Sequence, residues 1–171
     1  MRNKPLTQRT PDKTPPPENA DVVATRTIDV PRGFVFHMWT DHRHVAHWWG
    51  PQGFTNPRCE VDARPEGKMQ IDMRAPDGTT YEMQGRFYEL IEPERIVLLC
   101  EVPLPGDSEK NRLETLNTVT FADNSGKTVV TVRCQIVARS NGSPAGAAEI
   151  ERGWLQTLDR LEAYAENLAK Q

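Results

Sequence analysis

The stretch that decides the fold is residues 143–168, SPAGAAEIERGWLQTLDRLEAYAENL. Its apolar side chains recur every three or four residues and would form one stripe along about six turns of helix. These residues are Ile150, Trp154, Leu158, Leu161, Ala165 and Leu168. Ser143 is a suitable N-cap and Pro144 a suitable first residue. The pattern therefore predicts one long C-terminal helix with Trp154 at the centre of its buried face.

Gly153 is an unfavourable residue in the middle of this helix, because glycine costs about 1 kcal/mol of helix propensity relative to alanine. Three interpretations of it are open. Gly153 could let the helix backbone come close to a sheet, it could make room for a ligand, or it could simply be tolerated.

Five or six strand-like runs precede the helix, and turn-forming residues separate them. The runs are residues 59–63, 68–74, 80–90, 95–101, 113–121 and 128–138. Pro or Gly in the segments RPEG, APDG, EPE and DNSG marks the turns, a pattern typical of an antiparallel meander. Met69, Ile71 and Met73 alternate onto one face, as do the apolar residues of the last two runs. This alternation predicts a sheet that is covered on one side.

The segment before the meander predicts one more strand, residues 21–30, and two short helices, residues 34–39 and 42–49. Asp41 can cap the second helix, which Gly50-Pro51 must end. The whole pattern predicts an α+β domain over residues 21–168, with a curved antiparallel sheet of about seven strands around the C-terminal helix. Residues 1–20 contain five prolines and few apolar side chains, so we expect a disordered, Pro-rich tail.

The composition excludes several classes of function. The longest uninterrupted apolar run has five residues, 96–100, whereas a membrane-spanning helix needs about 20. The formal net charge is −3, with +2 on the first 20 residues and −5 on the rest, so nucleic-acid binding is not expected. The basic N-terminus lacks the apolar core of a secretory signal, and the three cysteines lack the spacing of a zinc site. We therefore expect a cytoplasmic protein with reduced thiols and no membrane insertion.

A series of short motifs resembles a known family. They are VPRGFVFHMWTD at residues 30–41, HWWGP at 47–51, RPEGK at 64–68, PDG at 76–78, GRFYELIEPER at 85–95 and GW at 153–154. In this order and spacing they resemble the Hsp90-ATPase-activator-homologue family, within the START-like (birch-pollen-allergen-like, SRPBCC) helix-grip superfamily. The resemblance implies a sheet that wraps the C-terminal helix and leaves a cavity between them. Its relatives include co-chaperones of Hsp90, lipid and hormone carriers, polyketide cyclases and many bacterial proteins without an assigned role.

The resemblance and the soft, aromatic side chains on the expected concave face together predict a site for a small hydrophobic or amphipathic molecule. The predicted cavity residues are Trp48, Trp49, Met69, Ile71, Met73, Tyr81, Met83, Phe87, Asn117, Val119, Phe121, Trp154 and Leu158. Among these, Tyr81 or Asn117 would orient the ligand. Trp39, Trp48 and Trp49 could either seal the core or form the rim of the cavity mouth.

Two alternatives to ligand binding remain open. One is a protein-interaction module of the co-chaperone type, with a chaperone or regulatory protein as its partner. The other is an enzyme of the cyclase or dehydratase type, for which the sequence offers no nucleophile elbow, phosphate-binding loop or evident acid–base pair. Cys100 and Cys134 are expected to be inert core thiols. We therefore expect a binding protein that needs no cofactor and carries no catalytic residue.

All four histidines, His37, His42, His44 and His47, lie within eleven residues of one another. His44 and His47 together with Asp41 make a metal site conceivable. The residues straddle a helix break, however, and a metal site usually needs three ligands in fixed geometry. We expect partly exposed, pH-sensitive positions and no bound metal.

Overall fold

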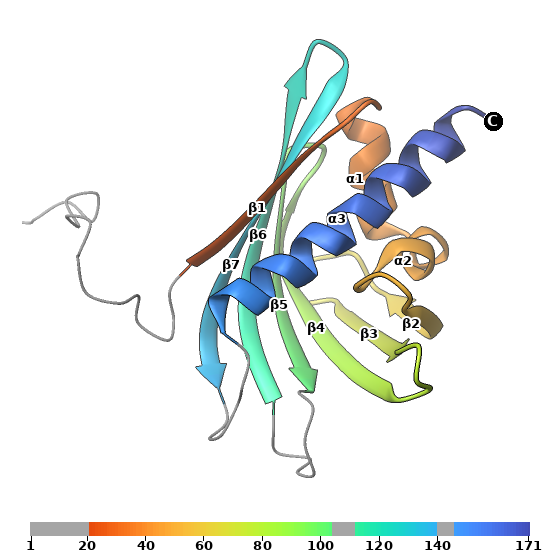
Figure 1. Cartoon of the computed structure of the whole chain (residues 1–171). Coiled ribbons are helices and arrows are strands. Elements are labelled where there is room, and N and C mark those ends of the chain that lie inside the picture. The colour runs from red at the N-terminus through yellow and green to blue at the C-terminus, as the bar shows by residue number, and fades with distance from the viewer. Residues whose placement is uncertain (1–20, 104–111, 140–145) are drawn as a thin grey trace, which may run out of the picture.

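The structure is a computed structural model that describes residues 21–103, 112–139 and 146–171 (Figure 1). The predicted tail, residues 1–20, and the predicted helix start at Ser143 and Pro144 lie outside the described residues. The elements, in chain order, are β1 (Asp21–Ile28), α1 (Arg32–Thr40), α2 (His42–Trp48), β2 (Thr55–Val61), β3 (Lys68–Arg74), β4 (Thr80–Ile91), β5 (Arg95–Pro103), β6 (Arg112–Asn124), β7 (Lys127–Arg139) and α3 (Ala147–Ala169). None of the helices in the described part of the chain is long and apolar enough to cross a membrane.

The seven strands form one antiparallel sheet in the order β1-β7-β6-β5-β4-β3-β2. Strands β2 to β7 follow one another as a meander, and β1 pairs with β7 at the far edge. The sheet curves, and α3 crosses its concave face diagonally while α1 and α2 cover the region beside it (Figure 1). The prediction of an α+β helix-grip architecture is therefore confirmed.

The apolar residues that alternate with polar ones in the sequence lie on the buried face of the sheet. Met69, Ile71 and Met73 on β3 are all buried, and so are the alternating residues 130, 132, 134 and 136 of β7. Register shifts interrupt the pairing of β2 with β3, β4 with β5, and β6 with β7. Such bulges bend a strand and increase its twist, which helps this sheet wrap around a helix.

Strand β2 begins at Thr55, four residues before the predicted start at Cys59. The added segment contains Pro57, which cannot donate a backbone hydrogen bond within a sheet. The structure tolerates Pro57 because β2 is an edge strand and because the register shift between Thr55 and Arg58 spans the proline.

Helix α3 begins at Ala147, with Gly146 in the N-cap position, and its two halves are buried to different extents. In the C-terminal half, Leu158, Leu161 and Ala165 are fully buried in the core. In the N-terminal half, Ile150 and Trp154 are only partly buried. The prediction that Trp154 lies at the fully buried centre of the helix is thus wrong, because Trp154 borders a cavity between the helix and the sheet.

A polar stripe on another face of α3 holds the segment that follows α2. Gln156, Arg160 and Tyr164 are spaced four residues apart and so lie on one side of the helix. The Gln156 Oε1 accepts from the backbone N–H of Gln52 at 3.1 Å, and the Tyr164 hydroxyl lies 2.7 Å from Nδ1 of His44. Between them, the Arg160 guanidinium donates hydrogen bonds of 2.9–3.1 Å to the carbonyl oxygens of residues 47, 49, 50 and 51.

We expect Arg160→Met to lower the free energy of unfolding by about 2–4 kcal/mol, because four carbonyl groups lose a charged donor at a partly buried position. Methionine keeps most of the apolar contacts of the arginine's aliphatic chain, so the loss of stability measures the contribution of the hydrogen bonds. The matched control is Arg152→Met on the exposed side of the same helix, which should change stability by less than about 0.5 kcal/mol. Equal urea midpoints for the two variants would contradict the importance of the Arg160 contacts.

Candidate functional site: an apolar cavity under the N-terminal half of α3

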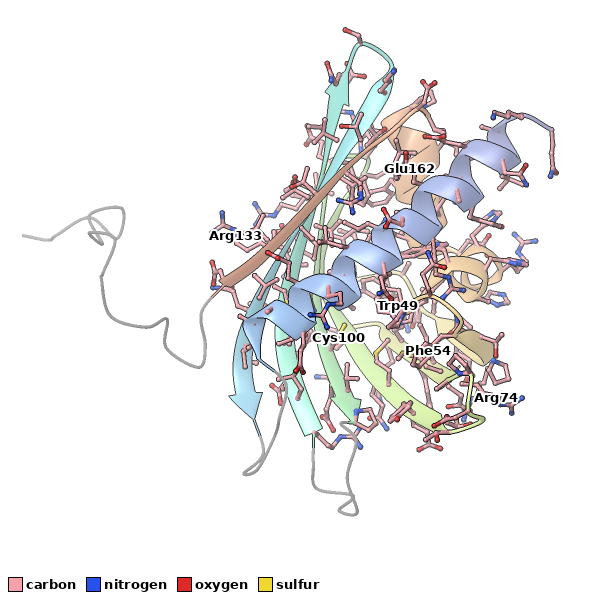
Figure 2. All side chains as sticks on the ribbon, viewed as in Figure 1. Trp49, Phe54, Arg74, Cys100, Arg133 and Glu162 are labelled. Carbon is pink, nitrogen blue, oxygen red and sulfur yellow. The ribbon has the colours of Figure 1, made fainter. Side chains whose placement is uncertain are left out.

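A cavity of about 190 Å³ lies between the N-terminal half of α3 and the concave face of the sheet. Helix α3 contributes Ile150, Gly153, Trp154 and Thr157 to its lining, and the segment after α2 contributes residues 49–51. The strands supply the remaining lining residues, Met73, Cys100, Val102, Leu113, Thr115 and Cys134. Figure 2 labels two members of this lining, with Cys100 beneath the N-terminal half of α3 and Trp49 on the side toward α2.

Gly153 makes part of this space. A β-carbon built at Gly153 would meet no atom within 4 Å, apart from the backbone of its own helix. The open surroundings exclude the interpretation that Gly153 allows a close approach of helix and sheet. They agree with the interpretation that Gly153 leaves room beside the helix.

The two cysteines of the cavity wall are neutral at ordinary pH. Burial raises the pKa of the Cys134 thiol to about 11, although hydrogen bonds with the Trp154 and Thr115 side chains act in the opposite direction. Burial also raises the pKa of Cys100. Strand β6 separates the two residues, so about 10 Å lies between their strands, too far for a disulfide. All three cysteines of the chain are free, and the two in the cavity provide soft, uncharged surface rather than nucleophiles.

The four tryptophans of the chain form one cluster at the side of the cavity. The contacting ring pairs have centroids 4.7–6.2 Å apart. Trp39 and Trp48 belong to the buried core, where the Trp48 ring N–H donates to the carbonyl oxygen of Met38 at 3.0 Å. Trp49 and Trp154 line the cavity, and their rings meet edge to face at 5.8 Å. A molecule in the cavity would therefore lie against half of the tryptophans of the chain.

Two polar side chains, Thr115 and Asn117, lie on the inward face of β6, and Thr115 lines the cavity. Asn117, on β6, is completely buried and follows Thr115 on the same face of the strand. Its side-chain NH2 donates to Thr115 Oγ1 at 3.0 Å and to the carbonyl oxygen of Leu98 at 3.2 Å. Its oxygen, Oδ1, has no hydrogen-bond partner among the described residues.

The residues predicted for the cavity are divided between the cavity and the core. Trp49, Met73 and Trp154 line the cavity. Nine others are buried in the interior: Trp48, Met69, Ile71, Met83, Phe87, Asn117, Val119, Phe121 and Leu158. Tyr81 is half-buried on β4, with its ring 6.3 Å from that of Phe54.

Ten lining residues were absent from the predicted set: Gly50, Pro51, Cys100, Val102, Leu113, Thr115, Cys134, Ile150, Gly153 and Thr157. A signal for several of them was present in the sequence. Leu113 and Thr115 continue the alternation of Asn117 and Val119 toward the start of β6. Extending the alternating pattern of inward-facing residues to the start of β6 would have identified Leu113 and Thr115 as lining residues.

Three of the histidines lie where the helices meet: the rings of His37 on α1 and His44 on α2 are 5.2 Å apart, and His44 and His47 both contact Tyr164 on α3. His37, Asp41 and His44 place one possible ligand atom each within 4.8 Å of one another, the one such group in the part of the chain that the structure describes. The Asp41 carboxylate already accepts from the Arg43 side chain at 2.7 and 3.1 Å and caps α2 through the Arg43 backbone N–H at 2.9 Å. This pairing with Arg43 holds the pKa of Asp41 well below its usual range. Burial lowers the pKa of His44, an effect that the Asp41 charge partly offsets.

The fold and the cavity define a helix-grip protein, in which a curved sheet wraps a long C-terminal helix and a partly open cavity lies between them. The chain belongs to the Activator of Hsp90 ATPase homolog 1-like protein family, whose sequence profile it matches over residues 29–166. This match confirms the resemblance that the sequence motifs indicated. None of the curated proteins compared with the chain matches it significantly.

Solved bacterial structures share the fold. Protein CV1439 from Chromobacterium violaceum is 26% identical, with a TM-score of 0.71 over 85% of this chain and 96% of its own. The AHSA1 protein SPO3351 from Silicibacter pomeroyi is 21% identical, with a TM-score of 0.70 over 89% of this chain and 100% of its own. A protein from Rhizobium leguminosarum is 23% identical, with a TM-score of 0.70 over 88% and 96% of the two chains. These three proteins share the fold of this chain.

We expect the histidine group to hold no structural metal, because Arg43 engages the one carboxylate of the group and places a positive charge beside it. The urea midpoint should be the same in EDTA and in equimolar Zn²⁺. As a control, Arg43→Ala should free the carboxylate and allow Zn²⁺ to raise the midpoint. A stoichiometric metal that survives dialysis of the unchanged protein would contradict this prediction.

Proposed function

We propose that this protein binds a small hydrophobic or amphipathic molecule, without covalent chemistry, in the cavity between α3 and the sheet. The observation that carries the proposal is the apolar space of about 190 Å³ beside Gly153. Burial of apolar surface, at about 25 cal/mol per Å², would supply most of the affinity. The family provides a precedent for a helix-grip cavity but does not identify the ligand.

The character of the lining favours binding over acid–base catalysis. The described lining residues include no carboxylate, histidine, lysine or arginine. Their titratable groups are the thiols of Cys100 and Cys134, which stay protonated near neutral pH because burial raises the pKa of each. An enzyme of the cyclase or dehydratase type would need a proton carrier that these side chains do not supply.

The main alternative is a protein-interaction module of the co-chaperone type. Such a module is expected to expose a contiguous apolar patch. Among the described residues, the exposed large apolar side chains are Val23 on β1, Val137 on β7, and Tyr88 and Ile91 on β4. Strands β5 and β6 separate the first two from the last two, so the described surface favours the alternative less than the cavity favours binding. Stimulation of Hsp90 ATPase activity by the purified protein would support the alternative directly.

The proposal is tested by NMR titration of the ¹⁵N-labelled protein with a library of aromatic compounds, flavonoids and lipids. The largest shifts should involve the Trp49 and Trp154 ring N–H signals and the backbone signals of Cys100 and Gly153. Tryptophan fluorescence should change in parallel, because two of the four tryptophans line the cavity. No shifts with any compound class would contradict the proposal.

We expect Gly153→Leu to weaken binding of any cavity ligand by about tenfold or more, because the new side chain occupies the space beside the helix. Stability should stay the same or rise by up to about 1 kcal/mol, since leucine is the better helix former. Gly33→Leu is the matched control, because Gly33 is also helical and also has no atom within 4 Å of its β-carbon position, but it is exposed on α1. Equal affinities of the two variants would show that the ligand binds elsewhere.

A further inference from the structure

We propose that Arg160 is a positioning residue of the ligand site: it fixes the cavity wall formed by residues 49–51 in the conformation that binds the ligand, without touching the ligand itself. The inference rests on the proposed binding function and adds to it a residue outside the cavity that sets the affinity.

Arg160 lies beside the cavity wall but is not one of the described residues that line the cavity. It belongs to the C-terminal half of α3 and, together with His47 and Gln52, borders a separate hollow on the surface. An effect of Arg160 on a bound molecule therefore has to pass through the residues that Arg160 contacts. Its carbonyl partners at residues 49, 50 and 51 are all lining residues.

A single nitrogen atom of Arg160 gathers the three carbonyl groups of the wall. Nη1 donates to the carbonyl oxygens of Trp49, Gly50 and Pro51 at 2.9, 3.0 and 3.0 Å. Because Nη1 carries two hydrogens, at least one of them is shared between two oxygens. Three carbonyl oxygens that converge on one point repel one another, and the charge-assisted bonds to the guanidinium offset this repulsion. Without a cation at this point, the three carbonyl groups would turn apart.

The other hydrogen bonds of the wall hold its two ends and not its centre. Asn56 Nδ2 donates to the Trp49 carbonyl oxygen at 2.9 Å, and the Phe54 N–H donates to the Pro51 carbonyl oxygen at 3.2 Å. The Gly50 carbonyl oxygen has the guanidinium as its one hydrogen-bond partner among the described residues. Gly50 also has a φ of +95°, in a region where glycine is free to change conformation. The guanidinium is therefore the main restraint on the centre of the wall.

A wall without this restraint should bind a ligand more weakly. Ordering a backbone segment during binding costs conformational entropy, and that cost is subtracted from the affinity. In the unchanged protein the segment is already ordered before the ligand arrives. We therefore expect loss of the Arg160 contacts to weaken binding by about five- to tenfold in a protein that is still folded.

The test measures the dissociation constant of p-xylene, an uncharged apolar probe, by NMR titration at a temperature at which every variant is folded. The signals of Gly153 and Trp154 report the bound probe. In Arg160→Met the dissociation constant should rise by about five- to tenfold. In Arg160→Lys it should stay within about threefold of the original value, because an ammonium group offers three donors to the three carbonyl groups.

Thr128→Val is the matched control, and it separates positioning of the wall from stability of the fold. Thr128 is completely buried, and its hydroxyl donates to the Val30 carbonyl oxygen at 2.6 Å, so this variant is destabilised as well. The described lining residues do not include Thr128. Its dissociation constant for p-xylene should therefore stay within about twofold of the original value.

A second measurement needs no variant and serves if Arg160→Met fails to fold. Because coupling is reciprocal, a ligand that favours the fixed wall also strengthens the hydrogen bonds of Arg160. Saturating p-xylene should slow hydrogen exchange of the Arg160 guanidinium by at least about twofold. The guanidinium of Arg43, which pairs with Asp41 away from the cavity lining, should show no change.

The outcomes separate the two proposals. If Arg160→Met and Thr128→Val bind p-xylene equally well, Arg160 has no positioning role and the cavity proposal remains. The same conclusion follows if bound p-xylene leaves the exchange of the Arg160 guanidinium unchanged. If neither p-xylene nor any compound of the library shifts a cavity signal, the proposed function fails and this inference fails with it.

Discussion

The arrangement of the helices depends on the contact between Arg160 and the segment that follows α2. The last carbonyl groups of a helix have no partner within the helix and need donors from elsewhere. Here a single guanidinium reaches the carbonyl oxygens of His47, Trp49, Gly50 and Pro51. Partial burial lowers the pKa of Arg160, but a guanidinium remains protonated in proteins and keeps all its donors. Because Trp49, Gly50 and Pro51 also line the cavity, the contact that joins α2 to α3 also positions one cavity wall.

The cavity exists because the two halves of α3 carry different side chains. The C-terminal half presents Leu158 and Leu161 to the core and fills the space above the sheet. The N-terminal half carries Ile150 and Trp154 on the same stripe, and both are only partly buried; Gly153 and Thr157 lie beside them in the cavity lining. One helix thus stabilises the domain with one end and borders a partly open cavity at the other. The difference between the two halves of α3 explains how the protein can have a well-packed core and still have room for a ligand.

The order of the elements could be predicted from the sequence because each depends on local patterns. The alternation in β3 and β7, the cap at Asp41 and the apolar stripe of α3 all appear in the structure. The cavity was harder to predict, because alternation shows which face of a strand is covered but not what covers it. Phe121 and Thr115 lie on the same face of β6. Phe121 packs against the rings of Phe36 and Trp39 on α1, at 5.4 and 6.0 Å, whereas Thr115 faces the cavity. Whether a residue of β6 meets α1 or faces the cavity depends on where α1 lies along the strand. The local sequence pattern does not indicate the position of α1.

Whether the space under α3 is open and apolar can be measured without reference to any particular ligand. Xenon enters dry apolar cavities of this size, so a crystal structure under xenon pressure would answer the question. We predict a xenon atom in contact with Met73, Cys100 and Trp154 in the unchanged protein, and its loss in Gly153→Leu. Full side-chain density in the cavity and no xenon under α3 would contradict it.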